Sequence, residues 1–261
     1  MTQIEKLSEL VILAVNQKQI PQHLFKYRTI DSVEKLLENN SMWFSNPNNF
    51  NDPFDCQIIA DSNNTEDEIK ELIRKTVKEN VSEKEISKLA NDSLNEAGKW
   101  EKTINDSIRN IIERTGICCF AENESNLLMW SHYTDSHKGV CLRFDVLKDP
   151  KFFVFPMHIN YRDDYPHYNH IQNKQDLINS LILSKSNDWK YEQELRVIKV
   201  NKTGLFEFEK DSLVEIIFGC KCREDDIEKI KKIVKQKNYN VIFSKAQKKK
   251  FEYGLDFIAI N

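Results

Sequence analysis

Residues 128–145 have the sequence LMWSHYTDSHKGVCLRFD, and the prediction of the fold begins with this stretch. Apolar side chains recur at helical spacing over residues 126–133, which predicts an amphipathic helix. Lys138-Gly139 is typical of a turn, and the apolar alternation that follows predicts a strand over residues 139–145. We therefore expect the chain to pass here from a helix into a sheet.

Polar aromatic and imidazole side chains gather in the same stretch. Trp130 and Tyr133 are expected where the helix meets the sheet, a frequent place for a ligand crevice. His132 and His137 lie beside them in the sequence. The alternative is a structural segment, in which the two aromatics are core residues with bonded polar tips and the two histidines have no special role.

The composition is that of an ordinary soluble protein. The chain has 261 residues, of which 40% are hydrophobic and 30% charged, enough for one large domain. No run approaches the ~20 apolar residues of a membrane span, and residues 3–18 form an amphipathic helix pattern with acidic residues rather than a signal peptide. The six cysteines include no CxxC pair. A cytoplasmic location, no membrane association and reduced, buried thiols are expected.

Charge is unevenly distributed along the chain. The net charge of -3 gives no overall attraction to nucleic acid. Lysines nevertheless cluster between residues 229 and 250, where they could form a basic edge for an anionic partner. A solvated helix face followed by a polar turn explains the same cluster.

The pattern of elements predicts an α+β fold with mixed, mostly antiparallel sheets and flanking helices. Charged residues at helical intervals predict a helical insertion at about 65–114, within a single domain of residues 1–261. Asp31 or Ser32 is the expected N-cap of an early helix, and a further helix is expected over residues 176–186. Strands are expected near residues 23–28, 42–45, 116–120, 139–145, 152–161, 189–200, 205–208, 214–218, 241–243 and 257–260.

The segment Trp189-Lys190-Tyr191-Glu192-Gln193-Glu194-Leu195-Arg196 is the second informative stretch. If it is a strand, its period of two places Glu192, Glu194 and Arg196 on one face. The structural alternative is a Glu–Arg ladder on the surface. His167 and His170 give only a weak metal signal, because no cysteine or carboxylate at ligand spacing completes a site, and no metal is predicted.

No phosphate-binding loop, GxGxxG, GxSxG or HExxH motif is present. The remaining polar groups suit an anionic, aromatic ligand and a developing cation, because arginine grips phosphate, rings stack on planar groups and carboxylates stabilise positive charge. The candidate site residues are Tyr27, Arg28, Ser45, Asn51, Asp52, Trp130, His132, Tyr133, Glu192, Glu194 and Arg196.

Four blocks together resemble the bacterial family of unknown function numbered 2971. They are Leu24-Phe25-Lys26-Tyr27-Arg28, the region from Trp43-Phe44-Ser45-Asn46-Pro47 to Phe50-Asn51-Asp52-Pro53-Phe54-Asp55, the region from Met129-Trp130-Ser131-His132-Tyr133 to His137-Lys138-Gly139-Val140, and the block from Trp189 to Arg196.

In the order of its parts, the chain also resembles ADP-ribosyltransferases, through Arg28, Ser45 and Glu192-Gln193-Glu194. That resemblance implies that Arg28 holds the NAD ribose and phosphate and that Ser45 supports the pocket. It implies that Glu194 stabilises the oxocarbenium, Glu192 orients the acceptor, and Trp130 or Tyr133 stacks on nicotinamide. The chain lacks a Ser-Thr-Ser motif and has a long insertion, so the role of Ser45 and the choice between the two glutamates stay open.

The expected function is an ADP-ribosyltransferase-like enzyme that transfers ADP-ribose from NAD, its co-substrate, to a nucleic-acid or protein acceptor. A toxin or phage-defence effector is the biological role considered, with an antitoxin or other regulatory protein as a further partner. One alternative is a non-enzymatic module that binds a ligand or partner. Another is a nuclease or other hydrolase, which requires a metal or a His132–acid pair.

Overall fold

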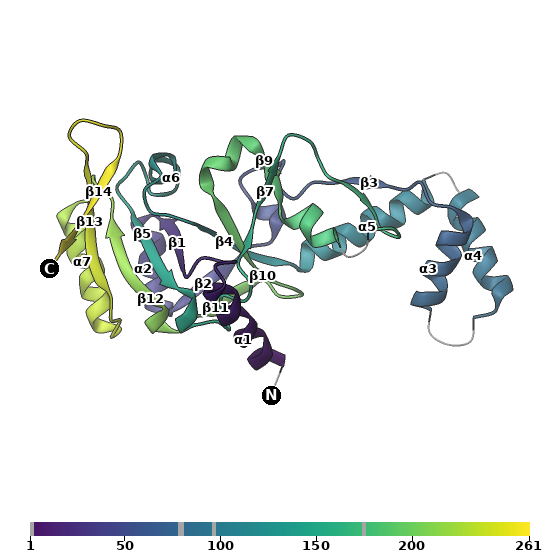
Figure 1. The fold of residues 1–261 in the computed structure, drawn as a ribbon, viewed down its shortest axis with the longest axis horizontal. Helices are drawn as coiled ribbons and strands as arrows, with labels where there is room; N and C mark the ends of the chain where they lie inside the picture. Colours follow the sequence, from purple (N-terminus) through teal and green to yellow (C-terminus); the bar gives the residue numbers. More distant parts are fainter. Residues whose placement is uncertain (1–2, 78–80, 96–97, 174–175) are drawn as a thin grey trace. The chain divides into compact units, whose positions relative to one another are not determined.

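A computed structural model describes residues 3–77, 81–95, 98–173 and 176–261 (Figure 1). Its contacts divide the chain into two compact units. The first comprises Met1–Ser45, Thr115–Ile159 and Asp188–Asn261, and the second comprises Asn46–Arg114 and Asn160–Asn187. The second unit contains the expected helical insertion and adds residues on both sides of it. The prediction of a single domain stays a prediction.

The first unit is built on one mixed sheet with the strand order β14-β13-β12-β5-β1-β4-β10-β6. All neighbouring pairs are antiparallel except β12 and β13. The α+β prediction is therefore confirmed. The strands are β1 (His23–Arg28), β4 (Gly116–Ala121), β5 (Val140–Asp145), β6 (Met157–His158), β10 (Glu194–Lys199), β12 (Leu213–Phe218), β13 (Ile242–Lys248) and β14 (Leu255–Ile260). A separate pair joins β2 (Ser41–Phe44) to β11 (Gly204–Glu207).

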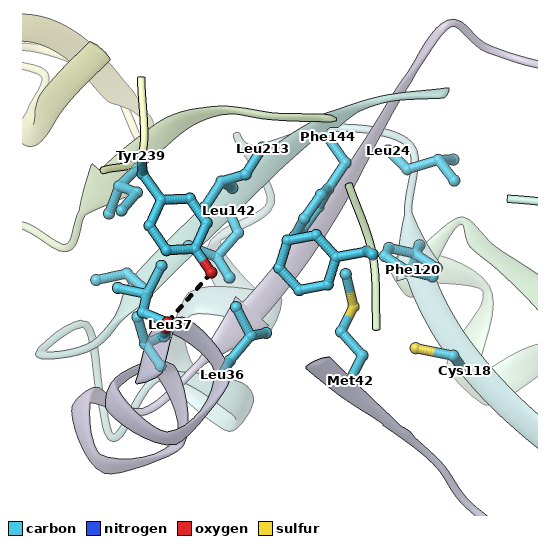
Figure 2. Packing of buried hydrophobic residues seen from close by; sticks show 14 of the residues in the cluster. Leu24, Leu36, Leu37, Met42, Cys118, Phe120, Leu142, Phe144, Leu213 and Tyr239 are labelled. Carbon is cyan, nitrogen blue, oxygen red and sulfur yellow. Dashed lines mark hydrogen bonds between the residues drawn. The ribbon is translucent and has the colours of Figure 1, made fainter. Parts of the chain in front are cut away.

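The larger core covers one face of this sheet. It joins alternate strand residues to the apolar stripes of α1 (Gln3–Asn16), α2 (Ile30–Asn39) and α7 (Glu224–Gln236). Figure 2 shows part of this core, where Tyr239 donates a 3.2 Å hydrogen bond to the Leu37 carbonyl. Alternation along β1 and β5 directs one set of side chains here and the other set to the opposite face.

Helix α2 begins earlier than predicted. Its N-cap is Thr29 rather than Asp31 or Ser32, and the Thr29 side chain makes no capping hydrogen bond. The helix starts earlier because the strand β1 ends at Arg28 and Thr29 is the last extended residue. At the other end Asn40 has the left-handed conformation of a helix C-cap and donates to the Leu36 carbonyl.

The second face of the sheet carries a smaller core. Phe25 and Tyr27 from β1, Ala121 from β4 and Cys141 from β5 pack there with helix α6 (Leu127–Tyr133). This side of the sheet positions most of the candidate site.

The second unit contains the helices α3 (Glu66–Thr76), α4 (Glu83–Asn95) and α5 (Lys99–Arg114). Two parallel pairs accompany them: β3 (Ile59–Asp61) with β8 (His167–Asn169), and β7 (Asn160–Arg162) with β9 (Ser184–Ser186). A capping box at Thr65 and Glu68 fixes the start of α3. The helix expected over 176–186 is shorter, because a π-helical turn occupies Ile178–Ile182 and the backbone then pairs with β7 as β9.

No helix in the described ranges has both the length and the apolar composition needed to cross a membrane.

Candidate active site

The two candidate glutamates lie in different secondary structures. A 3-10 segment, η5 (Asn187–Glu192), precedes β10, which begins only at Glu194. Between them Gln193 has φ 44°, in the left-handed region that most side chains avoid. The predicted strand from residue 189 is therefore corrected: Glu194 and Arg196 share a strand face, and Glu192 stands on the preceding turn.

Glu194 and Arg196 form a buried ion pair at the start of β10. The Arg196 Nε donates to Glu194 Oε1 at 2.7 Å, and Nη2 lies 3.3 Å from Oε2. Their exposed fractions are 4% and 0%. Cys119, on the neighbouring strand β4, is hydrogen-bonded to Glu194, and burial is the main cause that raises the pKa of its thiol. The predicted surface ladder is thus an interior pair, held in the fork geometry that a guanidinium offers.

The connection between β4 and α6, residues 122–126, joins the surrounding elements. Asn126 caps α6 by accepting from the Leu128 and Met129 amides, and its Nδ2 donates to the Tyr191 carbonyl. The buried Trp130 donates from Nε1 to the Glu124 carbonyl at 2.6 Å.

Tyr27 completes the packing against Trp130. Its ring meets the indole edge-on with centroids 5.3 Å apart, and its hydroxyl donates to the Asn123 carbonyl at 2.9 Å. Burial raises the pKa of Tyr27 far above its ordinary value. Trp130 and Tyr27 are therefore fixed members of the smaller core with satisfied polar tips, as the structural alternative for Trp130 also expected.

Tyr133 connects the surface to a buried carboxylate. It is half-buried on the last turn of α6, and its hydroxyl donates to Glu192 Oε1, whose residue is 4% exposed. His132, next to it, is exposed and pairs through Nδ1 with the Tyr191 hydroxyl at 3.0 Å. Its described partner is thus a phenol and not the acid that a hydrolase would need.

Four other predicted residues do not belong to this cluster. Arg28 pairs with Val140, whose side chain belongs to the larger core, so strand alternation directs Arg28 to the face opposite Glu194. Ser45 bridges Ile117, at the end of β4 remote from Ala121. Asn51 and Asp52 belong to the second unit, where Asp52 Oδ1 accepts from the Phe54 amide.

The sequence also contained a buried lysine that was not predicted as part of the site. Lys26 is 3% exposed, donates to the Cys119 carbonyl at 2.6 Å and lies 4.6 Å from the Phe120 ring centroid. Burial is the main cause that lowers its pKa, with a further contribution from the Arg28 charge. The available signal was its place in β1, between Leu24 and Arg28 on the inward face.

Metal ligation has no obvious candidate in this part of the chain. Across residues 3–77, 81–95, 98–173 and 176–261, no three His, Cys, Asp or Glu side chains are grouped to hold a metal ion. The expectation that the protein uses no metal stays a prediction.

The fold and site define an α+β protein with a buried carboxylate, guanidinium and phenol cluster at the junction of α6 and β10. The family model "Protein of unknown function (DUF2971)" matches residues 129–197, which supports the predicted resemblance over the range that carries Trp130, Tyr133, Glu192, Glu194 and Arg196. The blocks before residue 129 lie outside that match. Neither the curated proteins nor the solved structures contain a match to this chain.

Proposed function

We propose that the protein is an ADP-ribosyltransferase-like enzyme that uses NAD as its co-substrate and transfers ADP-ribose to a nucleic-acid or protein acceptor. The observation that carries the proposal is the pair of glutamates, Glu192 and Glu194, both 4% exposed and each held by a hydrogen-bond donor. Carboxylates fixed in a poorly solvated place stabilise a developing cation more strongly than exposed ones.

The reaction requires little covalent chemistry from the protein. The bond between ribose C1′ and the nicotinamide nitrogen breaks, and nicotinamide leaves as a neutral molecule with the bonding electron pair. Positive charge then develops on the ribose, where a carboxylate stabilises it. A lone pair of the acceptor forms the new bond to C1′, and the acceptor loses its proton to a carboxylate or to water.

Each residue of the cluster has a role in this scheme. Glu194 is the stabilising carboxylate, and Arg196 orients it through their ion pair. Glu192 orients the acceptor, with Tyr133 fixing its position, and Trp130 supports the wall of the site. Arg28 has no part in this centre, because it faces the other side of the sheet.

Nicotinamide release and transfer of label from adenylate-labelled NAD test the proposal with the full chain and candidate nucleic-acid and protein acceptors. Glu194→Gln is expected to reduce nicotinamide release about 100-fold or more. Tyr133→Phe is expected to reduce it about tenfold, because one hydrogen bond to a carboxylate is lost. Glu9→Gln, an exposed change of the same chemistry on α1, is the control and leaves the rate unchanged.

Thermal unfolding of each variant separates loss of chemistry from loss of fold. Absence of nicotinamide release by the folded wild-type chain with every acceptor class would contradict the proposal. Equal rates of nicotinamide release in the wild type and in the folded Tyr133→Phe and Glu194→Gln variants would also contradict it.

A non-enzymatic binding module is the second candidate. It is favoured by the fact that both carboxylates already have partners inside the protein, while His132 is exposed on the rim. A ligand that raises the melting temperature without being consumed would support this function over the enzymatic one.

A further inference from the structure

A separate cavity of about 770 Å³ lies in the first unit between α6 and the hairpin that joins β13 to β14. Figure 1 shows that hairpin loop extending beyond the strands on the side where α6 lies. The cavity falls within the range of roughly 300–1,000 Å³ that is usual for ligand sites. Leu127 and Ser131 of α6 form one wall, and residues 248–255 form the other.

The charged residues of this cavity are almost all basic. Lys221, Lys248, Lys249 and Lys250 line it, and Glu252 is the one acidic lining residue. Lys249 is paired with Glu252 at 2.6 Å. The other three lysines are exposed, and no ion pair joins them to an acid elsewhere in the described chain.

The lysine cluster seen in the sequence therefore separates into two parts. On α7, Lys229 pairs with Glu34 at 2.6 Å and Lys231 with Glu228 at 3.1 Å, as expected of a solvated helix face. The lysines at the end of β13 and directly after it, Lys248, Lys249 and Lys250, instead line the cavity.

The His137 imidazole lies close to these lysines in the cavity lining. His137 lines the cavity, and its pKa is lowered by burial and then by the charges of Lys221 and Lys248. Its Nε2 lies 3.2 Å from the Ser131 hydroxyl, while Nδ1 is buried and has no hydrogen-bond partner among the described atoms. Lys221 and Lys248 therefore both contribute positive charge near His137 in the cavity lining.

Two aromatic rings stand fully in solvent at the rim. Phe251 is 90% exposed and Tyr253 is 101% exposed, and the Lys250 ammonium lies 5.1 Å from the Phe251 ring centroid. Neither ring contributes to the core. Exposed rings beside a positive groove are the two components with which proteins bind single-stranded nucleic acid, by stacking bases and neutralising phosphates.

We propose that this cavity binds a segment of single-stranded nucleic acid, with Phe251 and Tyr253 stacking on bases and Lys221, Lys248 and Lys250 holding phosphates. A lipid bilayer fits less well, because a flat surface cannot enter a hollow of this size. An acidic peptide would use the lysines but would leave the two rings without planar partners. Binding at this cavity does not depend on whether the protein consumes NAD.

The test is fluorescence anisotropy of the full chain with a labelled twelve-nucleotide single strand between 50 and 200 mM salt. Three lysine–phosphate contacts predict a slope of log Kobs against log salt of about −2, and Lys248→Gln is expected to reduce its size by about 0.7. Phe251→Ala and Tyr253→Ala are each expected to weaken binding about 5- to 150-fold. Because both rings are exposed, these substitutions are not expected to unfold the protein, and weaker binding would reflect loss of the ring itself.

Matched controls carry the same chemistry elsewhere. Lys232→Gln on exposed α7 and Phe54→Ala, 66% exposed in the second unit, are expected to leave affinity unchanged. Absence of binding at 50 mM salt would overturn the proposal. Equal losses of affinity in the control and cavity variants would also overturn it. So would equal affinity for a duplex of the same length, or binding to phosphatidylserine vesicles without binding to the oligonucleotide.

Discussion

Removal of one member of the Glu194–Arg196 pair is expected to destabilise the first unit strongly. The two side chains are 4% and 0% exposed and meet at 2.7 and 3.3 Å, so Glu194→Ala leaves a guanidinium in the interior without this carboxylate. Breaking a buried pair in this way costs about 3–5 kcal/mol. At roughly 2–4 °C per kcal/mol for a chain of this size, the melting temperature should fall by about 6–20 °C.

A double-mutant cycle separates the pair from its two members. Glu194→Ala, Arg196→Met and the combined variant are compared by thermal unfolding, with signals from the first unit followed separately because the chain has two units. The combined variant should lose clearly less stability than the sum of the single variants, because it leaves neither charge without its partner. Strictly additive losses would refute the assignment of a coupled pair. Glu228→Ala removes an exposed carboxylate from Lys231 and is the control, with little change expected.

Two further predictions concern the neighbourhood of α6. Burial and nearby lysine charges lower the pKa of His137, so the folded state resists protonation of this side chain. The free energy of unfolding should therefore decline as the pH falls below about 6.5. Urea unfolding at pH 7.5 and 5.0 should show a smaller decline in His137→Gln than in the wild type. An equal decline in both proteins would contradict this cause. Gly139→Ala should cost about 1–3 kcal/mol or more in thermal unfolding, because a Cβ there would lie 2.2 Å from the Arg28 carbonyl oxygen. Gly254→Ala, where the nearest atom belongs to the flexible Lys249 side chain, is the tolerated comparison, and equal losses at the two glycines would rule out this steric explanation.

Local patterns in the sequence predicted most strands of the central sheet, but the strand expected over 152–161 is replaced by the short β6 (Met157–His158) and by β7 (Asn160–Arg162), which lies outside that sheet. Alternation of apolar and polar residues identified β1 and β5, and the helical spacing before Tyr133 identified α6. These elements are found because each buries apolar side chains whose spacing along the chain is already regular in the local sequence. The strand predicted from residue 189 was wrong up to residue 193, because Gln193 adopts a left-handed conformation that its residue type does not predict.

The composition of the candidate site was less accessible to prediction. Tyr27 donates to the Asn123 carbonyl and Asn126 donates to the Tyr191 carbonyl, and these contacts between residues far apart in the chain have no local sequence signal. Arg28 was grouped with the acidic residues by its order in the chain, whereas strand alternation directs it to the other face. The order of residues along the sequence was therefore a poorer guide to the site than the sheet face to which strand alternation directs each side chain.

Helix α6 is only seven residues long, yet it contributes to two different surfaces. Tyr133 donates to the buried Glu192 carboxylate, while Leu127 and Ser131 line the lysine-rich cavity. A helix of two turns moves as a rigid body, so a substitution that reorients α6 at one of these surfaces also reorients it at the other. Substitutions that alter one surface should therefore be assayed on both.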